Sequence, residues 1–153
     1  MSSEPRAVVV DRGRAFVIRR SSTRRLFPNC WDIPGGHVEC GESDEEALAR
    51  KLEEETGWRL EQVRAPLGEH RWLGDDGIAR VERDLLVQVE GNLDRPRLEV
   101  EKYPEARWIS GCELEVLLEA RRPGDDLTYR VVARGLETAA RLEQERKGDD
   151  GHG

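Results

Sequence analysis

A glycine-rich loop that runs into an acidic, well-capped helical segment is the feature that most constrains how this chain can fold. The segment covers residues 35–58 and begins with Gly35-Gly36, which lets the backbone turn and approach a ligand closely. Ser43 followed three residues later by Glu46 is a capping box, and Gly57 is a typical C-terminal stop. We therefore predict a helix from about residue 44 to residue 56, directly after a loop suited to ligand contact.

Short β-branched runs on both sides of this segment predict a sheet. The predicted strands are 7–10, 15–18, 31–33, 58–63, 68–73, 78–89 and 106–109, and helical spacing of apolar residues follows at 112–120 and 127–145. With 153 residues the chain suits one domain, which we place at residues 1–146, followed by a flexible tail at 147–153. The prediction is an α/β fold in which helices flank a mixed β-sheet.

The charge balance narrows the class of partner. The chain has 25 Lys and Arg against 32 Asp and Glu, and its net charge of -7 argues against a broad nucleic-acid or anionic-membrane surface. No apolar run approaches the roughly 18 residues that span a bilayer, and the first residues lack the apolar core of a secretory signal. Three cysteines fit neither a disulfide framework nor a zinc motif. We expect a cytoplasmic protein that binds a small molecule, with no nucleic acid and no membrane.

Three side chains of the predicted helix converge on one side. Residues 51, 54 and 55 lie within a sector of about 100°, because each helical residue advances about 100° around the axis. Glu54 and Glu55 offer adjacent carboxylates, which suit Mg²⁺ or Mn²⁺, and the carbonyl group of Gly36 in the preceding loop can add a ligand. The alternative is an ordinary solvated helix, since runs of glutamate usually mark an exposed face.

Two other regions are candidates for substrate contact. The basic loop at residues 19–25 carries four arginines and ends with Arg24 and Arg25, and together they are suited to contact distal phosphates, although a solvated connection is the plainer interpretation of any one arginine. Trp72 is a candidate for stacking on a nucleobase, with a structural position in the sheet as the alternative. An anionic small molecule needs such a basic patch or a metal ion, because the chain as a whole is acidic.

One spacing runs through the loop and the helix. It comprises the entry Trp31-Asp32-Ile33-Pro34-Gly35-Gly36, five residues before Glu42, seven before Arg50, and then Leu52, Glu54, Glu55, Gly57 and Trp58. This pattern resembles the signature of the Nudix hydrolases, which cleave nucleoside diphosphates linked to another group. The resemblance implies an α/β/α sandwich and hydrolysis of a pyrophosphate bond with Mg²⁺ or Mn²⁺. It also implies that Arg50 orients the glutamates by an ion pair, with Glu42 or Glu54 as partner, and that Glu54 and Glu55 bind the metal.

One position departs from that pattern. Members of the family carry glutamate directly after the arginine, where this chain has Lys51. An ammonium in place of a carboxylate changes the interaction with a nearby dication by several kcal/mol. Two placements are open: Lys51 turns out into solvent and leaves a one-metal site on Glu54 and Glu55, or it contacts a substrate phosphate and replaces the charge of one ion.

A further carboxylate would then have to assist the reaction. The family often places a glutamate in the loop before the last strand, and Glu101 occupies a comparable position, as metal ligand or base. Glu99 and Glu105 are the neighbouring alternatives. Any of the three is also consistent with a plain surface carboxylate, because loops are polar.

Two functions follow from these features. The first is a metal-dependent pyrophosphohydrolase acting on a nucleotide-type substrate, with Arg50, Glu54 and Glu101 as its catalytic residues. Its substrate would be held by Gly35, Gly36, Lys51, Arg24, Arg25 and Trp72. The second is a nucleotide-binding or regulatory module on the same fold, with catalysis weakened or lost at Lys51. The sequence does not distinguish among nucleoside diphosphate derivatives, and it leaves a monomer and a homodimer open.

Overall fold

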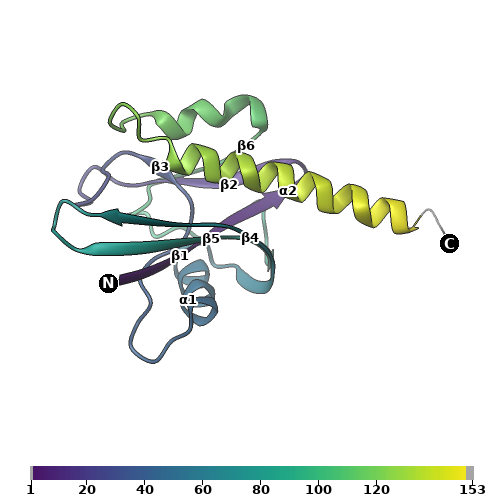
Figure 1. Cartoon of the computed structure of the whole chain (residues 1–153), viewed down its shortest axis with the longest axis horizontal. Helices are drawn as coiled ribbons and strands as arrows, with labels where there is room; N and C mark the ends of the chain where they lie inside the picture. Colours follow the sequence, from purple (N-terminus) through teal and green to yellow (C-terminus); the bar gives the residue numbers. More distant parts are fainter. Residues whose placement is uncertain (1, 151–153) are drawn as a thin grey trace.

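A sheet with helices on both faces makes up the part of the chain that the computed structural model describes, residues 2–150 (Figure 1). The elements in order are β1 (Ser2–Asp11), β2 (Arg14–Arg19), β3 (Trp31–Asp32), α1 (Asp44–Thr56), β4 (Arg59–Leu73), β5 (Ala79–Glu90), β6 (Glu105–Ile109), the 3₁₀-helix η1 (Gly111–Leu118) and α2 (Leu127–Asp150). No helix within this range is long and apolar enough to cross a membrane.

The sheet is mixed, as the sequence predicts. Its strands follow the order β3-β2-β1-β5-β4, and β6 pairs with β2 as well. Only the contact between β1 and β5 is parallel among these pairings, whereas the others are antiparallel. The predicted hairpin of β1 and β2 is confirmed.

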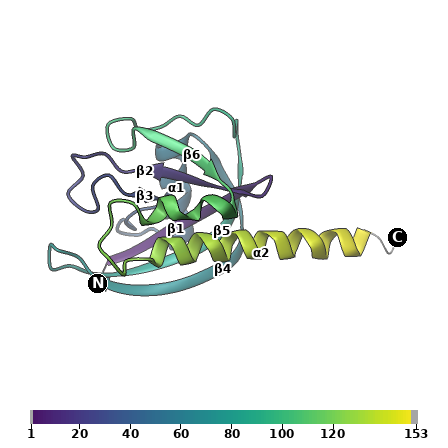
Figure 2. The ribbon, with the colours of Figure 1, turned by 90° about the horizontal axis from the view of Figure 1, so that it is seen from above.

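The sheet separates two apolar layers, because successive side chains of a strand point to opposite faces. On β1, Val8 packs in the layer that contains Val132 of α2. Its neighbour Val9 packs in the other layer, with Leu48 and Leu52 of α1. Both leucines are fully buried, and each such burial contributes roughly 1.5–3 kcal/mol. Figure 2 shows η1 and α2 together in front of the sheet and α1 behind it, which is the predicted α/β/α sandwich.

A gap between β1 and β2 positions the glycine-rich loop. The two strands pair only beside their turn, where Val10 faces Ala15, and they separate beyond it. The segment after β3 fills the opening: Ala7 of β1 donates a hydrogen bond to the Pro34 carbonyl at 2.8 Å, and Gly35 forms a bridge with Arg6. The backbone of the loop is therefore fixed by β1 before any side chain contributes.

One strand replaces two predicted ones. The predicted strands 58–63 and 68–73 are a single strand, β4, with register shifts between Leu60 and Gln62, Val63 and Ala65, and Pro66 and Gly68. Glycine and proline therefore do not end the strand. They sit in irregularities of an edge strand, where a lost ladder hydrogen bond is tolerated.

Two helices also differ from the prediction. The segment predicted as a helix at 112–120 is the 3₁₀-helix η1, and α2 continues to Asp150, past the predicted end near residue 145. Arg146 and Lys147 both reach Glu143, at 3.4 and 4.0 Å, which supports another helical turn. The first part of the predicted tail is therefore helical; its mobility stays a prediction, and residues 151–153 lie outside the described range.

Candidate active site

Helix α1 has the predicted bounds and caps. The Ser43 hydroxyl accepts a hydrogen bond from the Glu46 amide at 3.1 Å, and the Glu46 carboxylate accepts one from the Ser43 amide at 3.2 Å. At the other end Gly57 has φ 77°, a left-handed conformation that favours glycine. The apolar contacts of Leu48 and Leu52 then fix the rotation of the helix, so that Glu55 points inward.

Both loop glycines lie close to other parts of the chain. A side chain on Gly35 would meet the Pro5 carbonyl oxygen at 2.4 Å, and one on Gly36 would meet Cε of Lys51 at 2.5 Å. The Gly35 amide also donates a hydrogen bond to Oε2 of Glu55 at 3.0 Å. The loop therefore lies directly against α1 and ties it to β1.

Glu55 is a buried carboxylate with a free oxygen. Its side chain is 0% exposed, and its Oε1 atom has no hydrogen-bond partner within the described residues. Burial raises the pKa of Glu55 to about 7, against the opposing effect of the Lys51 ammonium; the charge of Glu99 adds to the rise. Burial therefore disfavours the ionised form of Glu55, which a cation beside it would favour.

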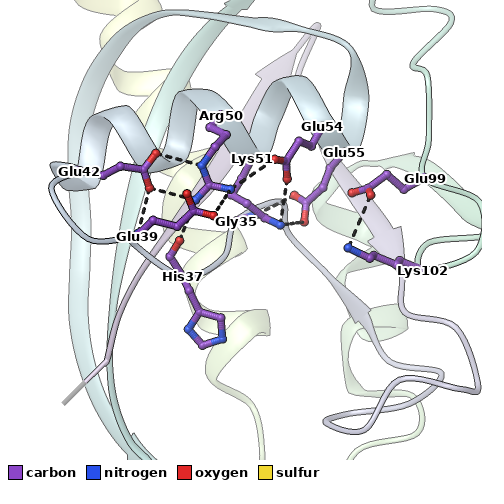
Figure 3. Close-up of polar contacts among 10 residues, drawn as sticks. All are labelled: Gly35, His37, Glu39, Glu42, Arg50, Lys51, Glu54, Glu55, Glu99 and Lys102. Atoms are coloured by element: carbon purple, nitrogen blue, oxygen red, sulfur yellow. Dashed lines mark hydrogen bonds and ion pairs between the residues drawn. The ribbon is translucent and has the colours of Figure 1, made fainter.

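Glu99 faces Glu55 from the loop before β6 (Figure 3). Its Oε1 atom is likewise buried and finds no hydrogen-bond donor in residues 2–150, while its Oε2 lies 3.6 Å from Nζ of Lys102. Unpaired carboxylate oxygens are the hard ligands that Mg²⁺ and Mn²⁺ take, so this pair fits a divalent ion. Across the described chain no three His, Cys, Asp or Glu side chains are grouped to hold a metal by themselves, so water or substrate oxygens would complete the shell.

Lys51 turns inward. Its Nζ lies 3.3 Å from Oε2 of Glu54 and 4.0 Å from Oε1 of Glu55, and its side chain is 17% exposed. The outward placement considered from the sequence is not what the structure shows. The contact with Gly36 explains the difference, because the bare glycine leaves a channel along which the lysine stem lies.

Arg50 binds several acidic partners at once. Its guanidinium donates to Glu42 at 2.9 and 3.0 Å, to Glu54 at 3.3 Å and to the His37 carbonyl at 3.0 Å (Figure 3). The hydrogen bonds from Arg50 lower the pKa of Glu42 to about 2. Both partners expected from the sequence, Glu42 and Glu54, therefore contact this arginine, which joins the loop to the helix.

A cleft of about 610 Å³ opens beside these residues. Its lining includes Gly35, Gly36, Lys51, Arg24 and Arg25, five of the predicted substrate contacts. The guanidinium of Arg24 lies 5.6 Å from the centre of the Tyr103 ring, and Arg25 pairs with Asp76 at 3.3 Å. Arg20 and Tyr103 also line the cleft; Arg20 is one of the four arginines of the basic loop 19–25, whereas Tyr103 was not predicted. Nothing in the sequence around Tyr103 signals its position.

A second cavity of about 410 Å³ shares part of this lining and is more apolar. Trp72 lines both spaces. The Phe27 ring lies 5.5 Å from the ring of Trp72 and at an angle to it, and the guanidinium of Arg80 lies 5.0 Å from its centre. Among the residues that line the second cavity, Arg6 pairs with Asp32 and donates a hydrogen bond to Glu82 at 2.7 Å. The predicted stacking role of Trp72 stays a prediction.

The three loop glutamates occupy different places. Glu99 faces Glu55, Glu101 lines the large cleft, and Glu105 lies on β6, paired with Arg19 at 2.8 Å. Of the three, Glu99 is therefore the one placed to share a ligand with α1. The sequence named it only as an alternative to Glu101, because the course of a loop follows from tertiary contacts.

Known proteins resemble this chain in sequence. A family model described as the NUDIX domain matches residues 5–131. The m7GpppN-mRNA hydrolase NUDT17 of Xenopus laevis is 52% identical over 50 residues, which are 33% of this chain and 17% of that protein. The ADP-ribose pyrophosphatase of Methanocaldococcus jannaschii is 50% identical over 61 residues, which are 40% of this chain and 34% of that protein. The matches thus span only 17% and 34% of the length of these curated relatives.

The fold has solved counterparts as well. The crystal structure of a MutT NUDIX hydrolase from Burkholderia pseudomallei superposes with a TM-score of 0.70 at 26% sequence identity. The superposition covers 87% of this chain and 96% of that one. With 87% of this chain covered, the similarity extends well beyond the loop and α1.

Proposed function

This chain belongs to the NUDIX domain family, and from that premise we propose that it hydrolyses the pyrophosphate bond of a nucleoside diphosphate linked to another group. One observation carries the proposal: the unpaired oxygens of Glu55 and Glu99 lie beside a cleft lined by arginines. A cation held by carboxylates next to positive side chains is an arrangement suited to a diphosphate.

The residues of the chain take distinct parts in this reaction. Glu55 and Glu99 would hold Mg²⁺ or Mn²⁺, with the Gly36 carbonyl as a further ligand and Glu54 at the edge of the site. Such an ion shields phosphate charge and lowers the pKa of a bound water. Arg50 holds the loop against α1 through its hydrogen bonds to Glu42 and Glu54.

Residues that line the cleft but do not belong to α1 would bind the substrate. Arg24 and Arg25 supply positive charge for the distal phosphates, and Trp72 supplies an aromatic surface between the two cavities. Glu101 lines the same cleft and would accept a proton or a water hydrogen bond there. The names of the relatives point to m7GpppN-mRNA and ADP-ribose as substrates worth testing.

The test is a substrate panel assayed with Mg²⁺ and with Mn²⁺. It should include nucleoside triphosphates, nucleotide sugars, ADP-ribose and m7GpppN-type dinucleotides, with release of phosphate, pyrophosphate or mononucleotide as the readout. We expect Glu55→Gln to lower the rate roughly 100- to 1000-fold and Glu54→Gln to lower it less. Glu53→Gln is the matched control, because Glu53 lies on an exposed part of the same helix. Wild-type rates in Glu55→Gln would end the assignment.

A second function is favoured by the position of Lys51. Its ammonium stands between Glu54 and Glu55, where it competes with a cation. A nucleotide-binding or regulatory module would show an increased melting temperature with nucleotide but no turnover, and Lys51→Glu would gain hydrolysis. If the wild type hydrolyses a substrate and Lys51→Glu hydrolyses it more slowly, this second function is excluded.

A further inference from the structure

We propose that the Lys51 ammonium is a built-in cation of this site: it occupies Glu54, limits the site to one divalent ion on Glu55 and Glu99, and contacts the bound phosphate. The phosphate contact rests on the proposed function. The occupation of Glu54 and the number of ions do not, since both concern the protein without substrate.

The two glutamates at the end of α1 differ in their partners. Each oxygen of Glu54 already has a cation, since Arg50 donates to Oε1 at 3.3 Å and Lys51 donates to Oε2 at 3.3 Å. Oε1 of Glu55 accepts no hydrogen bond in the described structure and lies 4.0 Å from the same Lys51 ammonium, and Oε1 of Glu99 accepts no hydrogen bond there either. Glu54 therefore has a hydrogen-bonded cation on each oxygen, whereas Glu55 and Glu99 each keep an oxygen that can bind a further cation.

The loop is shaped around an inward-facing lysine. A β-carbon at Gly36 would lie 2.5 Å from Cε and 3.1 Å from Cδ of Lys51, so any larger residue there would displace the lysine stem. Lys51 and Gly36 both line the 610 Å³ cleft. The ammonium has three donors, of which Glu54 takes one, so a donor remains for a phosphate oxygen in the cleft.

A second divalent ion near Glu54 would be repelled by this ammonium at a distance of a few ångströms. An ammonium also differs from a metal ion in that it cannot be removed by chelation. Part of the affinity for phosphate should therefore persist without any metal, and the metal-dependent part should come from one ion.

Mn²⁺ binding without substrate tests the first half of the inference, by titration calorimetry and by electron paramagnetic resonance. We expect one ion per wild-type chain and two per chain in Lys51→Glu. Lys51→Met, which keeps the apolar stem but frees Glu54, should bind Mn²⁺ at least about tenfold more tightly than wild type. Lys147→Met removes the same charge far along α2 and should behave as wild type. Two ions in the wild type, or equal affinity in Lys51→Met and wild type, would overturn the inference.

The glutamates provide a second route that leaves Lys51 in place. Glu54→Gln should change the affinity for Mn²⁺ by no more than about threefold, whereas Glu55→Gln should weaken it at least about 100-fold. Equal losses in the two variants would show that both residues ligate the ion, against the inference. Circular dichroism spectra and melting curves of all variants check that each is folded.

Inorganic pyrophosphate in excess EDTA tests the phosphate contact. We expect measurable binding by the wild type and by Lys147→Met, and binding at least about fivefold weaker in Lys51→Met. No binding by the wild type, or equal binding by Lys51→Met, would refute the contact. If the ion stoichiometry changes as expected but no variant hydrolyses any substrate, the inference about Lys51 is correct and the proposed hydrolysis is wrong. If the wild type hydrolyses a substrate but the ion stoichiometry does not change, the proposed hydrolysis is correct and the inference is wrong.

Discussion

Glu55 and Asp84 are both fully buried carboxylates with unpaired oxygens, but they stand in different surroundings. Glu55 accepts a hydrogen bond from the Gly35 amide, and its neighbours Gly36 and Lys51 line the large cleft. Asp84 lies on β5, 3.6 Å from Nε2 of His70 and beside Glu82, which lines the second cavity; neither Glu55 nor Asp84 itself lines either of the two cavities within residues 2–150. Burial raises the pKa of both groups.

The difference between these two acids separates a binding group from a structural one. The Lys51 ammonium and the Gly35 amide oppose the effect of burial on the pKa of Glu55, so its carboxylate stands where positive charge is favoured. The charge of Glu82 adds to the effect of burial on the pKa of Asp84, which favours a bound proton there. The same direction of pKa shift therefore has two meanings, and the neighbouring charges decide between them.

The largest expected effect comes from exchanging each acid for its amide. Glu55→Gln should reduce hydrolysis roughly 100- to 1000-fold, because the ligand charge is lost, while Asp84→Asn should change the rate by less than about threefold. Steady-state kinetics at saturating Mg²⁺ provides the measurement. A comparable loss of rate in Asp84→Asn would break the comparison.

Stability should depend on pH through Asp84. The folded protein holds a proton there that the unfolded chain releases above about pH 4, so folding binds a proton and the free energy of unfolding decreases as the pH rises. The slope is at most about 1.4 kcal/mol per pH unit between roughly pH 5 and pH 8. Urea unfolding across this range should show the slope in the wild type and a flatter dependence in Asp84→Asn.

The loop beside Glu55 offers a sharper test of the cleft. Gly36→Ala should lower the rate about tenfold, because the added carbon meets the stem of Lys51 and moves its ammonium. Gly111→Ala is a suitable control, since nothing lies within 4 Å of a β-carbon built there. If both variants keep the wild-type rate, the inward position of Lys51 has no part in turnover.

The smallest effect on the kinetics should come from Arg25, at the exposed edge of the large cleft. Arg25 is 73% exposed and already pairs with Asp76, so a phosphate contact there is screened by solvent. Arg25→Ala should raise KM about two- to fivefold and leave kcat unchanged, and the effect should shrink in high salt. A decrease of kcat with constant KM would contradict a role in binding alone.

The sequence predicts well what is determined locally. The bounds of α1 follow from the Ser43 cap and the Gly57 stop, whereas the contacts of Arg50 with Glu42 and Glu54 were expected from the resemblance to the family. The prediction fails where distant parts of the chain decide the outcome. Pro66 and Gly68 read as breaks but are absorbed in β4, because pairing with β5 continues past them.

The same division applies to the candidate site. The convergence of Glu54 and Glu55 is a property of one helix, whereas the partner of Glu55 depends on how the loop before β6 packs. Glu99 and Glu101 are two positions apart in the sequence, and only the fold shows that Glu99 faces Glu55 while Glu101 lines the large cleft. The direction of Lys51 likewise depends on a contact with Gly36, which is fifteen positions away.

The parallel pairing of β1 with β5 has a consequence for the order of folding. Ser2 lies opposite Arg80, so closing this contact brings together residues that are far apart in the chain, which is slow compared with forming a helix or a hairpin. The loop at Gly35 is held by β1, and β1 is anchored by β5. We expect α1 and the β1–β2 turn to gain protection first in pulse-labelled hydrogen exchange, and the Gly35 amide to gain it last. The carboxylate of Glu55 would then lose its water only when the rest of the molecule is complete, so an ion bound there would distinguish the finished fold from every state before it.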